Sequence, residues 1–183
     1  MKHTAFILTF ICATAWADNS QPWQDARINE INREPMTAHF LPFISEQAAL
    51  AQQALPDEQR FNVNPATERR ISLNGTWKFL YSKNNDACPA DFQKPGYNTK
   101  KWKDIQVPGS WELQGFDAPI YTDTRYPFPP NPPYVPTDYN PVGAYVHEFT
   151  VPEGWDGMDI FLDFEGVESA FYCWVNGELA GYS

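Results

Sequence analysis

Short segments with a two-residue hydrophobic period, separated by glycine and proline, set narrow limits on the fold of this chain. The clearest is residues 76–81, where Trp77, Phe79 and Tyr81 alternate with other side chains. Successive side chains of a β-strand point to opposite faces, so this period indicates a strand. Further segments of this kind are residues 105–107, 144–151, 158–164 and 170–175. The spacing predicts a mostly β protein, built as a β-sandwich or jelly roll.

The last predicted strand, residues 170–175, leads to further expectations about the end of the chain and about what covers the sheet. Asn176-Gly177 follows it, and this pair favours the positive φ angles of a two-residue hairpin turn, so residues 178–183 should return along it. Since no turn follows the returning strand, we expect the domain to be incomplete at Ser183. Residues 170–175 are also apolar on both faces, so we expect a cover over the second face, and another domain is one candidate.

Between Tyr126 and Pro141, seven of sixteen residues are proline, which excludes a helix or a central strand. Two interpretations stay open, a free spacer and a rigid loop that docks on a neighbouring domain. The aromatic residues Phe128, Tyr134 and Tyr139 favour docking, because exposed aromatic rings are costly.

The first seventeen residues have the pattern of a signal peptide. Lys2 supplies a positive start, residues 5–13 are apolar but too short to span a bilayer, and Ala15 and Ala17 fit a cleavage site. We therefore expect export to the periplasm or the exterior, without a membrane anchor. Residues 18–70 form an irregular N-terminal arm with one helix candidate at 45–54, capped by Ser45.

The net charge limits the classes of binding partner, and the cysteine content limits the disulfides that the chain can form. Lys and Arg number 13 against 23 Asp and Glu, a formal net charge of -10, so nucleic acid is excluded as a partner. Cys88 and Cys173 remain after cleavage, and either buried thiols or a single bridge would suit an exported chain.

Several motifs, taken together, resemble the amino-terminal part of bacterial β-galactosidases of glycoside hydrolase family 2. They are Ile31-Asn32-Arg33-Glu34-Pro35, Leu73-Asn74-Gly75-Thr76-Trp77, Val107-Pro108-Gly109-Ser110-Trp111, Gln114-Gly115-Phe116-Asp117-Ala118-Pro119-Ile120-Tyr121-Thr122, Asn131-Pro132-Pro133, Phe164-Glu165-Gly166-Val167-Glu168-Ser169 and Trp174-Val175-Asn176-Gly177. The resemblance implies that residues 71–183 are a jelly-roll, galactose-binding-like sugar-binding domain.

The resemblance also implies what this chain lacks. Family members hydrolyse glycosides with retention, using two glutamates of a (β/α)₈ barrel. No position here matches those glutamates, so no catalytic residue is assigned and the chain alone should be inactive. For the complete enzyme the resemblance implies a β-galactoside substrate and further domains, and it allows a homo-oligomer and the cofactors magnesium and sodium. The metal-binding aspartate of the family would follow Ser183, so no metal ligand is assigned.

One substrate-binding residue is carried over. In the family an asparagine follows the Pro-Ile-Tyr-Thr motif and bonds sugar hydroxyls, and here that position is Asp123. An ionised aspartate only accepts hydrogen bonds, so a sugar hydroxyl would have to donate to it. The alternative, an exposed carboxylate that caps a turn, has equal weight.

Other groups of residues that could in principle do chemistry are better explained by structural roles. Glu165 and Glu168 are expected in a solvated turn rather than as an acid/base pair. Residues 156–159 are expected to form a β-turn rather than a calcium loop. His39 and His147 lack further ligands at zinc spacing. Trp102 and Trp111 could stack on sugar rings, but a place in the core is the better expectation.

Two functions remain. The first is the leading, sugar-binding segment of an exported β-galactosidase that hydrolyses terminal β-D-galactosides. The second is a secreted carbohydrate-binding β-sandwich without catalysis.

Overall fold

The computed structural model describes residues 5–10, 21–57, 67–119 and 128–183. The chain divides into two compact units, residues 1–34, 75–151 and 159–183 in the first and residues 35–74 and 152–158 in the second. The described strands lie in the first unit.

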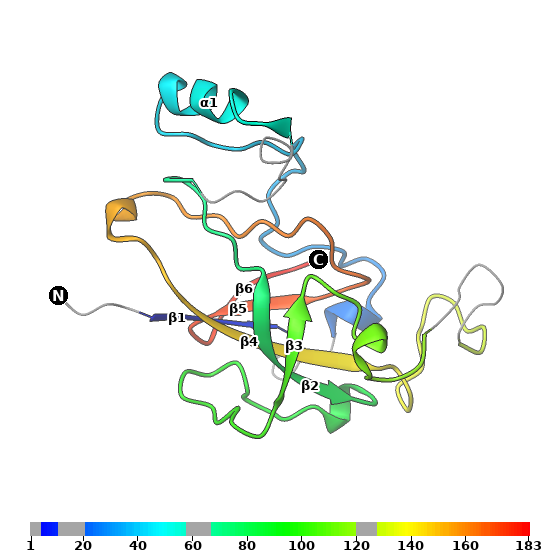
Figure 1. Cartoon of the computed structure of the whole chain (residues 1–183). Coiled ribbons are helices and arrows are strands. Elements are labelled where there is room, and N and C mark those ends of the chain that lie inside the picture. Colours follow the sequence, from blue (N-terminus) through cyan, green and yellow to red (C-terminus); the bar gives the residue numbers. More distant parts are fainter. Residues whose placement is uncertain (1–4, 11–20, 58–66, 120–127) are drawn as a thin grey trace. The chain divides into compact units, whose positions relative to one another are not determined.

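Six strands form one sheet in the order β3-β2-β4-β1-β5-β6, and every neighbouring pair is antiparallel (Figure 1). Their bounds are β1 Ala5–Phe10, β2 Gly75–Ser82, β3 Lys103–Val107, β4 Val142–Thr150, β5 Tyr172–Val175 and β6 Glu178–Tyr182. The strands predicted at 76–81, 105–107, 144–151 and 170–175 are therefore confirmed. The described residues are mostly β or irregular, as the period of two indicates.

The strand predicted at residues 158–164 is wrong. Residues 159–164 have no regular secondary structure, and Ile160 and Phe161 are 46% and 70% exposed. An alternating pattern forms a strand only where a neighbour supplies hydrogen bonds and a face is buried. No described strand pairs with this segment.

The predicted hairpin at the end of the chain is confirmed. Asn176 and Gly177 have φ angles of 53° and 91°, and they connect β5 to β6. Both angles are positive, as the mirror-image turns of tight hairpins require.

The second face of β5 is covered by this chain itself rather than by another domain. Tyr172, Trp174 and Tyr182 form a buried cluster on β5 and β6, and the partly buried side chains of Trp23, Ile28, Ile31 and Leu179 pack against it. Ile31 also exchanges two backbone hydrogen bonds with Tyr182, of 2.9 and 3.0 Å. Part of the segment expected to be an arm thus belongs to the core of the first unit.

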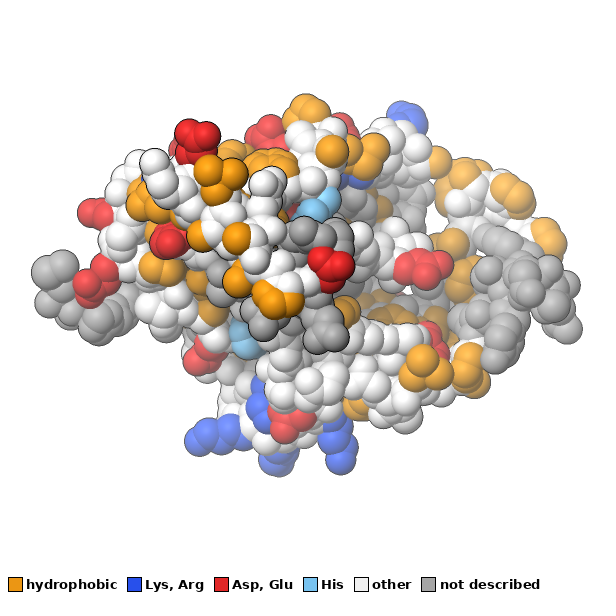
Figure 2. Space-filling view, turned by 45° about the horizontal axis from the view of Figure 1, so that its top comes forward, with side chains coloured by type: hydrophobic (Ala, Val, Ile, Leu, Met, Phe, Trp, Pro, Cys, Tyr) orange, Lys and Arg blue, Asp and Glu red, His pale blue; other side chains and the backbone are white. Residues whose placement is uncertain are grey.

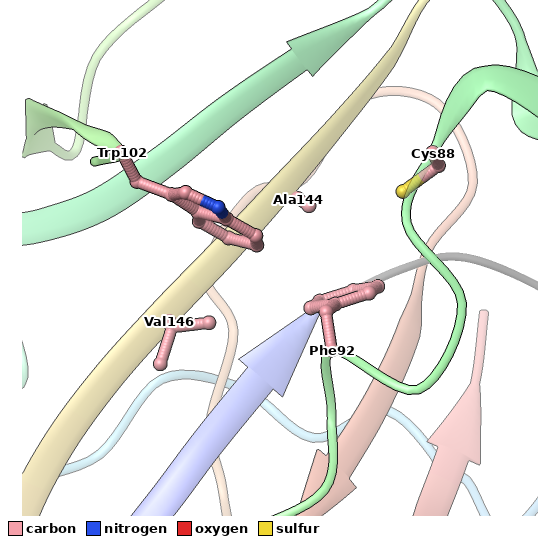
Figure 3. Close-up of a cluster of buried hydrophobic side chains, with 5 residues drawn as sticks. All are labelled: Cys88, Phe92, Trp102, Ala144 and Val146. Atoms are coloured by element: carbon pink, nitrogen blue, oxygen red, sulfur yellow. The ribbon is translucent and has the colours of Figure 1, made fainter. Parts of the chain in front are cut away.

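Around β2 and β4 the sheet is covered on both faces. On one face, Ala144 and Val146 of β4 meet Cys88, Phe92 and Trp102 (Figure 3). Trp102 is only 9% exposed, which confirms its expected place in the core. Phe79 of β2 points to the opposite face and is fully buried.

Cys88 and Cys173, the cysteines within the described residues, are buried and are not joined by a disulfide. Burial raises the pKa of the Cys173 thiol to about 12. Cys173 therefore remains protonated at neutral pH, and a thiolate nucleophile is not formed there.

The second unit contains the helix α1, Glu46–Gln53. The Ser45 hydroxyl accepts a hydrogen bond of 3.2 Å from the Ala48 N–H, as predicted for the cap. Within the described ranges, no helix has the length and apolar character needed to cross a bilayer. On the face shown in Figure 2, acidic side chains are spread widely, whereas most visible Lys and Arg side chains gather at one edge.

The predicted leader includes a strand of the sheet. Residues 5–10 form β1, which lies between β4 and β5 (Figure 1). Cleavage after Ala17 stays a prediction.

Candidate functional site

The binding residue predicted from the sequence, Asp123, lies in residues 120–127, outside the described residues. The structure does describe the chain that enters and leaves this segment, residues 109–119 and 128–141. These two stretches decide where the segment begins and ends, and they make up the site described below.

The entering stretch is fixed to strand β3 by one side chain. The Gln114 side-chain oxygen accepts a hydrogen bond of 2.8 Å from the Gln106 N–H, and its nitrogen donates one of 3.0 Å to the Gln106 carbonyl. Gln114 ends a short 3-10 helix, Glu112–Gln114, that follows Trp111. The paired amide holds this turn beside the end of β3.

Trp111 packs into the sheet rather than facing solvent. Its ring centroid lies 6.0 Å from that of Phe79 and 6.2 Å from that of Tyr81. The indole nitrogen is buried. Trp111 thus packs against the core on one side, but it is only half-buried, so the expectation of a fully buried core residue is met only in part.

Close packing of Trp111 depends on a glycine in β4. A Cβ atom at Gly143 would lie 2.6 Å from Cζ3 of Trp111 and 2.7 Å from Cε2 of Phe79. Both neighbours are rigid rings in a packed layer, so neither can move aside without displacing the other.

We expect Gly143→Ala to lower the free energy of unfolding by about 1–3 kcal/mol, because the added methyl group overpacks the ring layer. Urea unfolding followed by tryptophan fluorescence would measure it. Gly154→Ala, where nothing lies within 4 Å of the added Cβ, is the matched control. Equal stability of the two variants would contradict the packing argument.

Asp117 is the charged centre of the site. Tyr81 of β2 donates a hydrogen bond of 2.5 Å to its Oδ2, and Tyr139 donates to the same carboxylate at 2.8 and 3.0 Å. The Ala118 N–H donates to Oδ1 at 2.8 Å. Asp117 precedes residues 120–127 and Tyr139 follows them, so this carboxylate joins both sides of the segment to the sheet.

Hydrogen bonding from both tyrosines keeps Asp117 ionised. The bond from Tyr81 is the largest cause that lowers the Asp117 pKa, and the bond from Tyr139 adds to it. The tyrosine pKa values move upward, that of Tyr81 mainly through burial and that of Tyr139 mainly through its bond to Asp117. At neutral pH the cluster is therefore a fixed acceptor with two fixed donors and has no proton to transfer.

Hydrogen bonds exclude a free spacer at the end of the proline-rich segment, whereas docking on a neighbouring domain stays a prediction. Tyr139 bonds Asp117, and the Asn84 side chain donates to the backbone carbonyls of Thr137 and Asp138 at 3.0 and 3.1 Å. Residues 137–139 are thus attached to the first unit of this chain.

The other residues considered as candidates for chemistry have structural roles or exposed positions. Glu165 and Glu168 are both exposed, in a stretch without regular structure. The β-turn expected at residues 156–159 lies one residue earlier, at 155–158, and is closed by a hydrogen bond of 3.1 Å from the Met158 N–H to the Trp155 carbonyl. His147 stacks on Trp77 with ring centroids 4.7 Å apart, and burial lowers its pKa.

Sequence reasoning did not assign a role to Asp117, Tyr81 or Tyr139. Their bonds span 36 and 22 residues along the chain. A local pattern cannot reveal such a contact. The only available signal was the place of Asp117 inside a motif shared with the family.

Comparison with known proteins adds to this geometry. The family model "Glycosyl hydrolases family 2, sugar binding domain" matches residues 71–183. The β-galactosidase of Priestia megaterium is 38% identical over 175 residues, 93% of this chain and 16% of that protein. Those of Halalkalibacterium halodurans and Psychromonas ingrahamii are 46% and 37% identical over 65% and 90% of this chain.

The chain spans only 12 to 16% of the length of these three relatives. Strands β2 to β6, Asp117 and both of its tyrosine partners lie inside the matched range. The chain belongs to glycoside hydrolase family 2 and contains the sugar-binding domain of that family.

Proposed function

We propose that this chain is the leading, sugar-binding domain of an exported β-galactosidase. The parent enzyme would hydrolyse terminal β-D-galactosides with retention, using two glutamates whose carboxyl groups are about 5–5.5 Å apart. Those glutamates are assigned to a barrel domain that follows this chain. The observation that carries the proposal is the similarity to β-galactosidases over 93% of the chain.

In this proposal the domain completes the galactose pocket with a jelly-roll loop. The Asp117 cluster holds Asp117 and Tyr139, which flank residues 118–138, against Tyr81 of β2. Asp123 would then accept a hydrogen bond from a galactose hydroxyl, since an ionised carboxylate cannot donate. Such a bond contributes to the rate only if the loop is held in place before substrate binds.

Metals of the complete enzyme have no assigned ligand here. Asp117 is the described carboxylate nearest in sequence to the loop, and both of its oxygens already accept hydrogen bonds. It therefore does not fit the role of a magnesium or sodium ligand.

We expect Asp123→Ala, made in the full-length protein, to lower kcat/KM for a nitrophenyl β-galactoside about ten- to hundredfold, the value of one hydrogen bond to a charged group. Asp138→Ala changes an exposed aspartate beside the same site and serves as the control. If both variants keep the parent value, Asp123 only caps a turn.

The alternative function, a secreted carbohydrate-binding module without catalysis, differs in size and in activity. The intact mass of the protein from its source separates the two. A species several-fold heavier than 21.0 kDa with galactosidase activity supports the enzyme. A species that starts at Asp18 and ends at Ser183 would contradict it.

A further inference from the structure

Lysine is distributed very unevenly along this chain. Six of its seven lysines lie between residues 78 and 103, and residues 78–104 contain only three acidic residues and no arginine. This stretch therefore has a positive net charge, whereas the whole chain has a formal net charge of -10. On the face shown in Figure 2, most visible Lys and Arg side chains gather at one edge. Such a local excess of one sign attracts a ligand of the opposite sign.

Three exposed lysines surround the start of strand β3. Lys103 is the first residue of the strand. Lys100 and Lys101 lie in the turn immediately before it, which is closed by a hydrogen bond of 2.9 Å from the Trp102 N–H to the Thr99 carbonyl. The side chains of all three lysines are exposed. Together these three residues are called the lysine patch below.

The charge of the lysine patch is not neutralised by other described residues. Lys78 is paired with Asp104 at 2.6 Å, and Lys94 is paired with Asp91 at 3.0 Å. These pairs use the two aspartates that are nearest to the patch in sequence. Within the described ranges, no carboxylate forms an ion pair with a lysine of the patch. Its three ammonium groups are therefore available to an anionic ligand.

The backbone that carries the lysine patch is fixed by buried rings. Trp102, between Lys101 and Lys103, packs in the core with its ring centroid 5.7 Å from that of Phe92. The Lys100 N–H also donates a hydrogen bond of 3.1 Å to the Asn98 side chain. The turn is thus ordered before a ligand binds, which lowers the entropy cost of binding.

Tyr97 adds an aromatic surface next to the lysine patch. Its ring centroid lies 5.9 Å from that of Trp102 in an edge-to-face arrangement, and the residue remains 37% exposed. A tyrosine in this position offers an apolar ring face to a sugar ring and a hydroxyl group to the sugar hydroxyls. The combination of free ammonium groups and an exposed ring suits a ligand that has both anionic groups and sugar rings.

We propose that the lysine patch and Tyr97 bind a sulfated galactan, a galactose polymer with sulfate esters on some of its hydroxyl groups. The inference rests on the proposed function in one respect, that the parent enzyme acts on terminal β-galactosides. A sulfated galactan supplies such galactosides and the negative charges in one molecule. Its sulfate oxygens accept charge-assisted hydrogen bonds from ammonium groups. A polymer of uronic acids carries charge but no galactose.

Charge density separates this ligand from nucleic acid. Duplex DNA carries one negative charge per about 1.7 Å of its axis. Beyond the lysine patch, such a polymer would meet a chain whose remaining residues are strongly acidic. A partly sulfated galactan brings charge to the patch and neutral sugar rings to the rest of the surface. The patch therefore favours the galactan over nucleic acid.

The lysine patch is separate from the Asp117 cluster, and strand β3 extends from one toward the other. Lys103 begins the strand, and Gln106 near its end holds the loop that contains Gln114. At about 3.3 Å per residue, Lys103 and Gln106 are about 10 Å apart along the strand. A galactan whose terminal sugar lies at the loop can thus reach the patch with its inner sugars. The patch is assigned to inner sugars of a polymer.

The first test compares two galactans that differ only in charge. The full-length protein is titrated calorimetrically with a sulfated galactan and with the same polymer after desulfation, at about 50 mM salt. We expect the sulfated polymer to bind about thirtyfold more tightly, and about 200 mM salt to remove most of the difference. Equal affinities would overturn the proposal. Tighter binding of polygalacturonate, duplex DNA or anionic lipid vesicles would overturn it as well, because the patch would then not select a galactan.

The second test locates the binding. One variant of the full-length protein combines Lys100→Gln, Lys101→Gln and Lys103→Gln. A control with the same change in net charge replaces three exposed arginines outside residues 78–104, Arg27→Gln, Arg33→Gln and Arg69→Gln. We expect the patch variant to bind the sulfated galactan about thirtyfold more weakly, about threefold per charge, and the control to stay within about twofold of the parent. Equal losses would show that only net charge matters and would overturn the proposal.

A smaller variant keeps the test decisive if the combined one does not fold. Lys101→Gln alone should lose about threefold, and Arg27→Gln, which also removes one exposed charge, should lose none. Identical affinities of these two variants would overturn the proposal.

Hydrolysis of a nitrophenyl β-galactoside by the parent protein tests the proposed function separately. A protein without this activity that still prefers the sulfated galactan would contradict the proposed function and keep the binding site. An active protein that binds both galactans equally would keep the proposed function and overturn the binding site.

Discussion

Phe79→Ala is expected to lower the free energy of unfolding by about 3–5 kcal/mol, the range for a buried phenylalanine replaced by alanine. Phe79 is fully buried, and its ring contacts Phe116 and Tyr145 at centroid distances of 4.6 and 4.7 Å as well as Trp111. The variant leaves a cavity where the loop before residues 120–127 meets the sheet. Pulse proteolysis across a urea series would measure the change.

Phe161→Ala is the matched control, because this phenylalanine is 70% exposed. Its removal should change stability by less than about 0.5 kcal/mol. If both substitutions cost the same, the packing of Phe79 against the loop is not what holds this part of the domain together.

The second large effect is expected at Asp117. In the full-length protein, Asp117→Ala should lower kcat/KM for a β-galactoside about hundredfold, because small displacements of a positioning group have effects of that size. The variant removes the acceptor for Tyr81 and Tyr139, so the two residues that flank 118–138 lose their attachment to each other and to β2. Asp117 is a positioning residue, since its carboxylate is already occupied by protein donors.

A purely structural role would give a different result. The melting temperature should stay within a few degrees of the parent, because Asp117 and Tyr139 are exposed and Tyr81 remains packed against Trp111. Tyr139→Phe, which removes one of the two tyrosine bonds, should give an intermediate loss. Asp138→Ala should give none. A large fall in melting temperature with unchanged kcat/KM would contradict the assignment.

Acid provides an independent test of the same carboxylate. Its pKa is lowered in the folded protein, so its contribution to stability is complete above about pH 4, the unfolded value. That contribution is lost as the pH falls through the lower folded pKa. The carboxyl carbon of Asp117 should accordingly titrate below the unfolded value in an NMR pH series. A midpoint at the unfolded value would show that the tyrosines do not hold the ionised form.

Local patterns predicted local structure well. Asn176-Gly177 predicted a hairpin because two positive φ angles are a property of the turn residues themselves. Ser45 predicted a helix start for the same kind of reason. Trp77, Phe79 and Tyr81 predicted a strand because the sheet buries that face.

Features that depend on distant partners were not predictable. Residues 158–164 have the same alternation as β2, yet no described strand lies beside them, and the pattern alone does not produce one. A cover over β5 was expected, with another domain as one candidate, and Trp23 and Ile31 provide it from an earlier part of the chain. The role of Asp117 depends on hydrogen bonds from Tyr81 and Tyr139, which are distant from it in the sequence.

The paired amide of Gln114 has a consequence for how the protein behaves in a crowded solution. Strand β3 ends the sheet, and its outward backbone groups form an edge that another molecule's strand could extend. Gln114 binds both the N–H and the carbonyl of Gln106, as the peptide group of a neighbouring strand would. One side chain thus occupies the backbone groups of Gln106, near the end of β3, that a further strand would need. The residue that holds the loop in place also protects the domain against edge-to-edge aggregation.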